Sequence, residues 1–212
     1  CYLLGDYDHR LTRVALDDPD PRTNETTIGS TTTLKTDAVA LQPRTGVLYG
    51  VDVDMERSLG YLGTFDLATG AFQARELDLG DGQGPLGMVY FYDVSGLTFD
   101  PVTGWLYATQ IITGTGAADV LFRVDPQTGR AVGGGFGGDD YVPLYPLPAF
   151  PELSDVDDIS IDPATGEMFA ILNNSSTGDR LVRIDKQTGA LTDVGALGIA
   201  EVEGLDFDAH GR

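Results

Sequence analysis

A short phrase that recurs along the chain constrains the fold more than any other feature of the sequence. The phrase reads VALQPRTGVLYGV at 39–51, LTFDPVTGWLYAT at 97–109 and ISIDPATGEMFAI at 159–171, with a truncated copy, LDFDAHGR, at 205–212. A second phrase alternates with it, as LGTFDLATGAFQA at 62–74, LFRVDPQTGRAVG at 121–133 and LVRIDKQTGALTD at 181–193, with a degenerate copy at 11–29. Each pair of phrases takes roughly 45–60 residues, a period typical of repeat architectures.

Each copy of either phrase predicts a β-hairpin. In the copy at 97–109, Leu97 and Phe99 alternate with a polar residue, which is the period of a strand. Asp100 and Pro101 then begin a turn, because an Asp carboxylate accepts hydrogen bonds from turn amides and proline pre-sets φ. Gly104 supplies the positive φ at which the second strand starts. Two such hairpins make a four-stranded antiparallel sheet.

A sheet of this kind is apolar on both faces, and radial stacking of such sheets produces a β-propeller. We therefore predict an all-β fold: a β-propeller of four-stranded antiparallel blades with four repeats visible, as a single domain over 1–212. The C-terminus supplies a first strand at 205–208, and the N-terminus supplies three later strands at 2–5, 11–16 and near 26–29. Two interpretations stay open. Either the ends share one blade and close a ring of four, or the chain is a segment of a propeller with about six to eight blades.

The balance of charge excludes two classes of partner. The 212 residues include 33 acidic and 13 basic side chains, which gives a net charge of −20. Such a surface repels nucleic acid and anionic lipid, so we expect neither as a partner. No stretch reaches the roughly 18 apolar residues that a transmembrane helix needs. The acidic surface is explained either by attraction of cations or by solubility, or by adaptation to a salty milieu or to a GC-rich genome.

The motifs D-P-x-T-G-x-L-Y and R-(V/I)-D-x-x-T-G resemble those of secreted or surface-anchored bacterial and archaeal β-propeller repeat proteins, over almost the whole chain. The resemblance implies the architecture and a secreted or cell-surface location. It implies no single function, because such repeats occur in adhesins, scaffolds and enzymes. Cys1 is the only cysteine, so no internal disulfide is expected. Cys1 is interpreted either as a lipoprotein anchor or, as we favour, as part of a strand inside a repeat.

Aligning the repeats places acidic residues in two columns before the first strand of each blade. The outer column holds Lys35, Asp93, Asp155 and Glu201, and the inner column holds Asp37, Ser95, Asp157 and Glu203, with Asp158 beside it. First strands are innermost in a propeller, so these side chains are expected to ring one mouth of the channel. Their repulsion falls if they bind a hard cation, and calcium takes about six to eight oxygen ligands. We hypothesise that Asp37, Asp157 and Glu203 coordinate an axial calcium ion; the alternative is that each acid caps its own loop.

The phrase EVEGLDFD at 201–208 is also similar to the blade start of esterase-like phytase and gluconolactonase-type propellers. In that resemblance Glu203 corresponds to an acidic residue that faces the channel and can ligate calcium. The other blades depart from the phrase, with Asp37, Ser95 and Asp157 in the place of Glu203. The resemblance therefore implies a metal-binding position and carries no activity.

Two insertions interrupt the repeats, DLGDGQGPLGMVYFYD at 78–93 and GGGFGGDDYVPLYPLPAFPELSD at 133–155. Both lie between a second hairpin and the next first hairpin, so both are expected to project from the same face. Insertions on one face of a repeat protein often form its binding surface. The candidate binding residues are aromatic: Tyr90, Tyr92, Tyr141, Tyr145 and Phe150. The alternative is that these rings cover the channel end or pack on a neighbouring blade.

Other chemistry has little support in the sequence, which contains no G-x-S-x-G elbow, no H-E-x-x-H and no C-x-x-C. His9 and His210 fall in predicted turns, where the alternatives are a zinc site shared between the chain ends and simple solvation. The arginine column of the third strands, Arg13, Arg123 and Arg183, is expected to pair with neighbouring acids.

We therefore predict a non-catalytic secreted or cell-surface module that binds a protein or a glycan, or that self-associates into an extracellular assembly. The second hypothesis is a calcium-dependent hydrolase of the lactonase or phosphoesterase kind, with its metal at the acidic mouth. Such an enzyme needs a base or nucleophile beside the metal, and the sequence offers no clear candidate. A purely structural repeat is the third possibility.

Overall fold

The computed structural model describes residues 2–4, 10–15, 25–29, 38–112, 118–149, 155–173, 178–208 and 211, and these residues contain seventeen strands and no helix. The strand bounds are β1 Tyr2–Leu4, β2 Leu11–Arg13, β3 Thr26–Ile28, β4 Val39–Leu41, β5 Leu48–Asp54, β6 Leu59–Phe65, β7 Phe72–Ala74, β8 Asp81–Gly84, β9 Gly87–Tyr90, β10 Val94–Phe99, β11 Leu106–Gln110, β12 Asp119–Val124, β13 Tyr141–Leu144, β14 Asp155–Ile161, β15 Met168–Asn173, β16 Arg180–Ile184 and β17 Leu191–Ala196.

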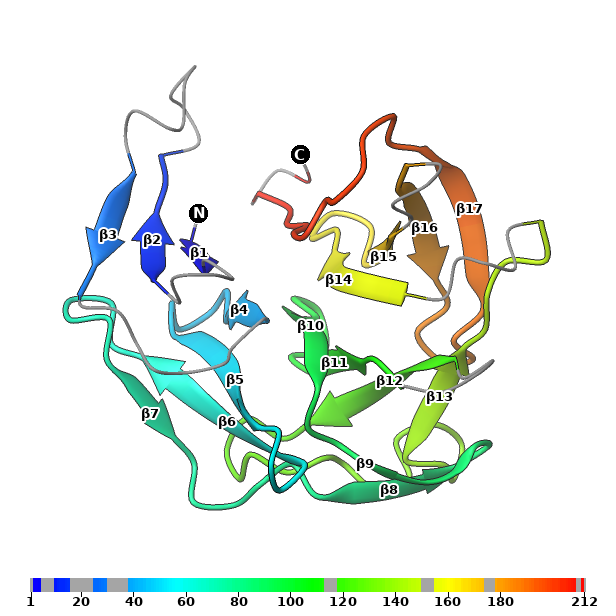
Figure 1. Cartoon of the computed structure of the whole chain (residues 1–212), viewed down its shortest axis with the longest axis horizontal. Coiled ribbons are helices and arrows are strands. Elements are labelled where there is room, and N and C mark those ends of the chain that lie inside the picture. The colour runs from blue at the N-terminus through cyan, green and yellow to red at the C-terminus, as the bar shows by residue number, and fades with distance from the viewer. Residues whose placement is uncertain are drawn as a thin grey trace.

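The strands form antiparallel sheets in which neighbours follow one another along the chain. Blade 2 has the order β4-β5-β6-β7, blade 3 the order β10-β11-β12-β13, and blade 4 the order β14-β15-β16-β17. Blade 1 is a three-stranded sheet, β1-β2-β3, and β8 and β9 form a separate hairpin. Figure 1 shows the blades following one another around a centre, with β4, β10 and β14 innermost. The predicted all-β fold with four-stranded antiparallel blades is confirmed.

The predicted turn chemistry is confirmed in five hairpins. Their aspartates share one arrangement: the carboxylate accepts a hydrogen bond from the backbone amide two residues on, at 2.8–2.9 Å. These aspartates are Asp66, Asp100, Asp125, Asp162 and Asp185. The glycine four residues after each one has φ between 72° and 83°, a region that favours glycine. The turns therefore follow from local sequence alone.

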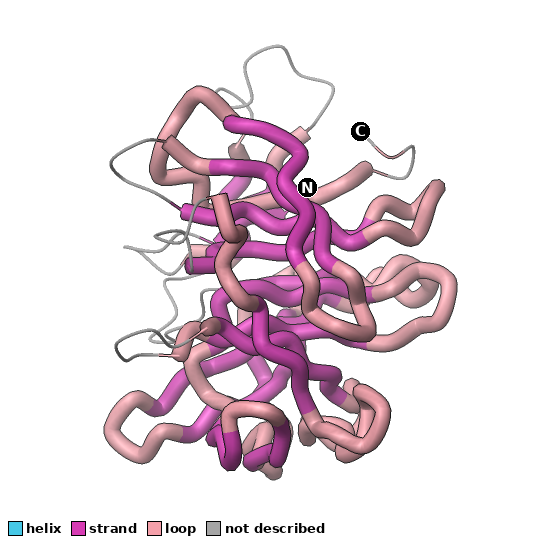
Figure 2. Tube along the Cα trace, turned by 90° about the vertical axis from the view of Figure 1, so that its right-hand side faces the viewer, coloured by secondary structure: helices cyan, strands magenta, loops and turns pink. Residues whose placement is uncertain are grey.

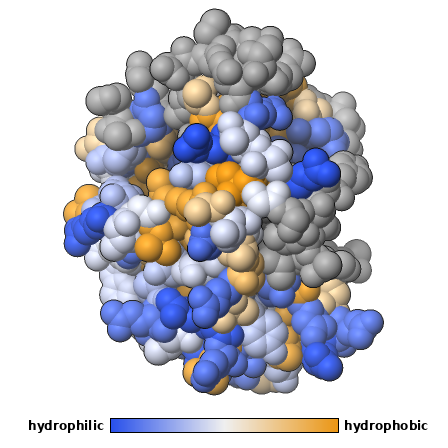
Figure 3. All heavy atoms as spheres, turned by 90° about the vertical axis from the view of Figure 1, so that its left-hand side faces the viewer, coloured by the Kyte–Doolittle hydropathy of each residue, from blue (hydrophilic) through white to orange (hydrophobic). Residues whose placement is uncertain are grey.

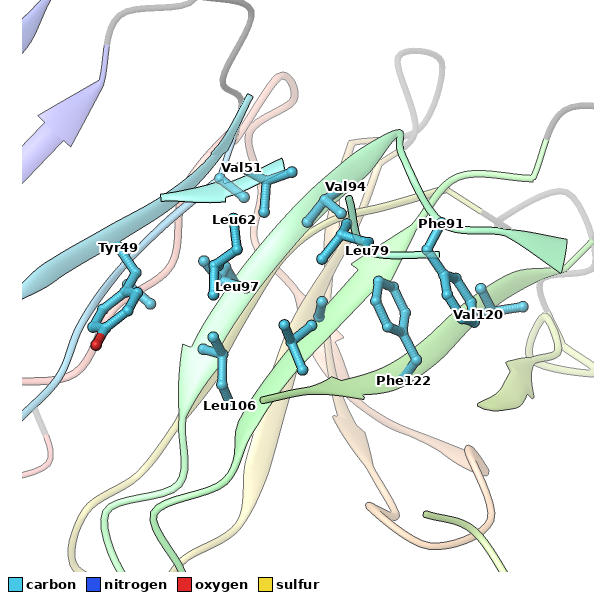
Figure 4. Packing of buried hydrophobic residues seen from close by; sticks show 14 of the residues in the cluster. Tyr49, Val51, Leu62, Leu79, Phe91, Val94, Leu97, Leu106, Val120 and Phe122 are labelled. Carbon is cyan, nitrogen blue, oxygen red and sulfur yellow. The ribbon is translucent and has the colours of Figure 1, made fainter. Parts of the chain in front are cut away.

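The hydrophobic core lies between the blades. Leu106 and Tyr107 are neighbours in β11, and their side chains point to opposite faces of blade 3. Leu106 joins a cluster with Val51 and Leu62 of blade 2, whereas Tyr107 joins a cluster with Met168 of blade 4. The first of these clusters is drawn in Figure 4. Because each blade is apolar on both faces, each packs against two neighbours.

The C-terminal segment 201–208 lies on blade 4 without forming a strand. The backbone amide of Leu205 donates to Asp158 at 2.8 Å, and the rings of Phe207 and Phe169 have centroids 5.5 Å apart. In the repeat, Leu205 corresponds to Ile159, the residue that begins the apolar part of β14. The segment therefore occupies the place of the first strand of a further blade. Within the described residues β1 pairs with β2 alone, so closure of the ring by the two ends stays a prediction.

Loops and turns gather at the two ends of the strands, as Figure 2 shows in a view turned by 90°. Figure 3 shows one side of the molecule, where hydrophilic residues cover most of the face and a band of apolar residues crosses it. Among the described residues no helix is long and apolar enough to cross a membrane.

Candidate functional site

The two insertions meet at the outer edge of blade 3, where the β8–β9 hairpin docks beside β13. Gln83 exchanges two bonds with Asp140: its amide donates to the carboxylate at 2.7 Å, and its carbonyl accepts from the Asp140 amide at 2.8 Å. The Asp140 carboxylate also accepts from the amide of Gly134 at 2.7 Å. One aspartate of the second insertion therefore fixes both the hairpin of the first insertion and its own loop.

Tyr141 anchors the tip of the same hairpin. Its hydroxyl accepts from the amide of Leu86 at 3.0 Å and donates to the carbonyl of Gly87 at 2.9 Å. A side chain at Gly84 would place its Cβ 2.9 Å from the Tyr141 ring, so only glycine fits this close approach. Tyr141 is fully buried, and its prediction as a binding-surface residue is wrong because its hydroxyl is needed to satisfy the hairpin backbone.

The anchored hairpin presents an exposed apolar surface. The exposed fractions are 40% for Leu86, 53% for Met88 and 52% for Tyr90, and Tyr145 after β13 is exposed by 57%. We call these four residues the insertion surface. Tyr90 and Tyr145 are thus as exposed as a binding role requires, and that role stays a prediction.

The other two aromatic candidates differ. Tyr92 is half-buried, and its amide donates to the Gln110 side chain at 2.8 Å. The same side chain donates to the carbonyl of Tyr90 at 2.9 Å, so Gln110 holds the end of the first insertion. Phe150 lies outside the described residues.

Several acidic side chains lie close together where β14 begins. The pKa of Asp157 is raised to about 7, chiefly by burial and also by the negative charges of Asp155, Glu203 and Asp179, although a hydrogen bond with Asn173 acts to lower it. Oδ2 of Asp157 is buried without a hydrogen-bond partner. A buried carboxylate oxygen among like charges is unfavourable unless a proton or a cation reaches it.

Asp119 extends this cluster toward blade 3. Its pKa is raised to about 7, chiefly by burial and also by the charges of Asp155 and Asp93, although two backbone amides that donate to it act in the opposite direction. Burial likewise raises the pKa of Asp93 and of Asp155. We call the six acids Asp93, Asp119, Asp155, Asp157, Asp179 and Glu203 the acidic mouth.

The remaining predicted metal ligands lie elsewhere or have other partners. Asp158 accepts from the amides of Ile159 and Leu205, both at 2.8 Å, so it holds the C-terminal segment on β14. Its burial raises its pKa to about 8. Glu201 is exposed, with φ of 60°, and Asp37 lies outside the described residues. Within the described ranges no three His, Cys, Asp or Glu side chains are arranged to hold a metal ion.

Two aspartates that the sequence analysis did not single out each hold the start of the segment that follows their own hairpin, β14 in one case and the C-terminal segment in the other. Asp119 accepts from the amide of Val156 at 2.8 Å, and Asp179 accepts from the amide of Val202 at 2.8 Å. Both aspartates are buried. Each stands two residues before the leucine that begins a copy of the second phrase, at 121 and at 181. Aligning that column of the repeat would have found both aspartates.

The arginine column behaves differently in blade 3 and in blade 4. Arg183 pairs with Glu167 at 2.7 Å, as expected for a structural arginine. Arg123 instead packs against aromatic rings, with its guanidinium carbon 5.2 Å from the centre of the Trp105 ring, 5.3 Å from that of Tyr107 and 5.0 Å from that of Phe136. The position that holds Glu167 in blade 4 holds Trp105 in blade 3, so Arg123 has a ring where Arg183 has an acid.

Solved structures share this arrangement of blades. The chain superposes on a chain of a nidogen/laminin complex with a TM-score of 0.57 at 12% identity, over 98% of its own length and 65% of the other. The chain has a β-propeller fold. A GH43 glycoside hydrolase with endo-xylanase and exo-arabinofuranosidase activity gives a TM-score of 0.57 at 10% identity, over 95% of this chain and 41% of the other.

A bifunctional GH43-CE protein of Bacteroides eggerthii gives 0.52 at 15% identity, over 96% of this chain and 26% of the other. The propeller described here thus spans less than two thirds of the length of each of these structures. No protein-family model matches the sequence, and no curated protein matches it either. At these identities the likeness establishes the fold and no activity.

Proposed function

We propose that the propeller is a non-catalytic binding module whose partner docks on the insertion surface. The observation that carries the proposal is the exposure of Leu86, Met88 and Tyr90 on a hairpin whose backbone is held by buried groups. Tyrosine and methionine are enriched at protein interfaces. A surface that is already ordered before binding loses less entropy when the partner arrives.

The partner we propose is a protein or a glycan encountered in a secreted or cell-surface setting, with self-association as the related case. The net charge of −20 disfavours nucleic acid and anionic lipid. One structure that the chain resembles belongs to a complex of nidogen and laminin, which gives one precedent for a protein partner on this fold. Nothing in the proposal requires a catalytic residue.

Selection from a random-peptide library and screening on a glycan array test this proposal. We expect ligands whose affinity falls at least about tenfold when Leu86, Met88 and Tyr90 are all replaced by serine, because the anchors of an interface carry most of its binding energy. Replacing Met55 and Val102, which are also exposed, by serine is the matched control and should leave binding unchanged. Ligands that bind the triple variant as well as the unaltered protein would contradict the proposal.

The acidic mouth supports a second candidate, a site for one divalent cation such as calcium. The buried, unpartnered Oδ2 of Asp157 and the nearby carboxylates of Asp155 and Glu203 are the hard oxygen donors that calcium prefers. A bound cation would supply Lewis-acid chemistry for a lactonase-like or phosphoesterase-like hydrolase. The six side chains of the acidic mouth are all carboxylates. We propose them as candidate ligands of the cation, and we assign none of them as a catalytic base.

Calorimetric titration with calcium tests the second candidate at pH 8, where the carboxylates of the mouth are mostly ionised. We expect saturable heat that the Asp157→Asn substitution abolishes and that Asp185→Asn, in an exposed turn, leaves intact. An absence of heat from a folded protein would contradict the cation site.

A further inference from the structure

A cavity of about 420 Å³ lies at the turn end of blade 4, between the two hairpin turns. Its lining includes Glu167, Arg183, Asp185, Lys186, Gln187 and Thr192. It belongs neither to the insertion surface nor to the acidic mouth. Its charged side chains number two acids and two bases, so it is locally neutral in a protein whose net charge is −20.

The repeat identifies the corresponding place in blade 3. Arg123 pairs across the strands with Tyr107, and Arg183 pairs in the same way with Phe169. Glu167 corresponds to Trp105, which precedes β11 as Glu167 precedes β15. The two arginines therefore occupy equivalent positions on the same face of their blades.

In blade 3 the face of the arginine is covered by aromatic rings. Phe136 and Trp105 lie on Arg123 with ring centres at 5.0 Å and 5.2 Å. Phe136 belongs to the second insertion. In blade 4 the strand β17 begins two residues after Gly189, so the chain has no room for an equivalent insertion between β16 and β17. The position of the second ring is taken by Glu167.

The guanidinium of Arg183 keeps a surface for a ring in spite of its ion pair. Glu167 takes one edge nitrogen, Nη1, at 2.7 Å, and the side chain of Arg183 is 45% exposed. A planar guanidinium donates hydrogen bonds from its edges and stacks on aromatic rings through its faces, so the two interactions are compatible. Lys186 is already held by Asp100 at 2.7 Å, so both cations among the described lining side chains have an acidic partner that competes with an anion.

We propose that this cavity is a recognition site for an aromatic side chain of a partner protein, whose ring stacks on Arg183 as Phe136 stacks on Arg123. Blade 4 also has an aromatic residue opposite its arginine. Phe169 of β15 pairs across the strands with Arg183 of β16, as Tyr107 of β11 pairs with Arg123 of β12. The proposal goes beyond binding at the insertion surface, because it lies on another blade and either site can fail without the other.

Titration with indole, followed by amide and arginine side-chain signals in nuclear magnetic resonance spectra, tests the proposal. We expect saturable shifts centred on Arg183, Gln187 and Thr192, with a Kd on the order of 1 mM for so small a ligand. Arg183→Ala should weaken the binding at least about tenfold. Arg180→Ala is the matched control, because Arg180 lies in the same strand and pairs with Asp193.

A repeat-swap variant gives an independent arm. Glu167→Trp installs the residue of blade 3, where Trp105 and Phe136 contact Arg123 together, so the variant should keep the fold and still show the indole shifts. Indole shifts that are absent, that persist in Arg183→Ala or that are lost in Glu167→Trp would overturn the proposal. Saturable binding of glucose in place of indole would also overturn it, because the site would then be a glycan site.

Discussion

Replacing Phe122 by alanine is expected to lower the free energy of unfolding by about 3–5 kcal/mol, the usual cost of removing a large buried aromatic side chain. Phe122 in β12 is fully buried, and its ring stacks on that of Phe91 with centroids 4.1 Å apart and planes at 10°. Phe91 ends the first insertion, so this contact joins the insertion to the blade. Chemical denaturation measures the loss.

The same substitution should loosen the β8–β9 hairpin more than it loosens blade 4. Figure 4 shows Phe91 and Phe122 at the end of the cluster from which the hairpin departs. Without Phe122 the Phe91 ring loses its stacking partner, so amide exchange in β9 should accelerate while that in β16 stays slow. Phe122→Val, which copies the corresponding Val182 of blade 4, should cost less.

Val102→Ala, at a residue exposed by 69%, is the control and should change stability by no more than about 0.5 kcal/mol. A loss below about 1 kcal/mol for Phe122→Ala, or equal acceleration of exchange in all blades, would contradict the packing described for this insertion.

The hairpins and their stacking were predictable because their causes lie within a few residues. An aspartate followed four residues later by a glycine defines five of the turns, and alternating apolar residues define both faces of the strands that flank them. Leu106 and Tyr107 show this most simply, since adjacent positions in one phrase serve two different interfaces. The repeat also placed Asp155, Asp157 and Glu203 in its two acidic columns, and their role as metal ligands stays a prediction.

The meeting of the two insertions was not predictable in the same way. Tyr141 bonds to residues 54 and 55 positions earlier in the chain, and neither phrase specifies that distance. The sequence analysis took its aromatic ring as a sign of exposure and binding. In the structure its hydroxyl instead pairs with the amide of Leu86 and the carbonyl of Gly87 at the hairpin tip. Arg123 was mispredicted because its ring partners include Phe136, which lies in an insertion outside the repeat.

Stability is expected to decrease as the pH rises from about 4 to about 8. A group whose pKa is raised by folding contributes stability that is complete below its unfolded pKa and is lost as the pH passes the folded pKa. For Asp119 and Asp157 the pKa rises from an unfolded value of 3.8 to about 7, and for Asp158 it rises to about 8, in each case chiefly through burial. The loss therefore begins near pH 4 and is complete above pH 8.

Asp157→Asn isolates one contribution to this slope. The amide has nearly the volume of the carboxyl and does not ionise, so the variant should lose less stability between pH 5 and pH 8 than the unaltered protein. We expect a difference of about 1 kcal/mol, well below the value for complete burial, because Asp157 is only half-buried and water screens its charge. The control is Asp185→Asn, because turn amides lower the pKa of Asp185 and it ionises below this range.

Calcium distinguishes the two explanations of the acidic mouth in the same measurement. If a cation binds the ionised carboxylates, 10 mM calcium should raise stability at pH 8 by about 2.7 kcal/mol for a Kd near 0.1 mM, and it should flatten the pH slope. At pH 5 the carboxyls hold protons, and the gain should be small. A steep slope that Asp157→Asn reduces but calcium leaves unchanged would mean that the mouth is a set of destabilising buried acids. No slope at all would contradict the raised pKa values, and with them the convergence of charge from which the cation site was inferred.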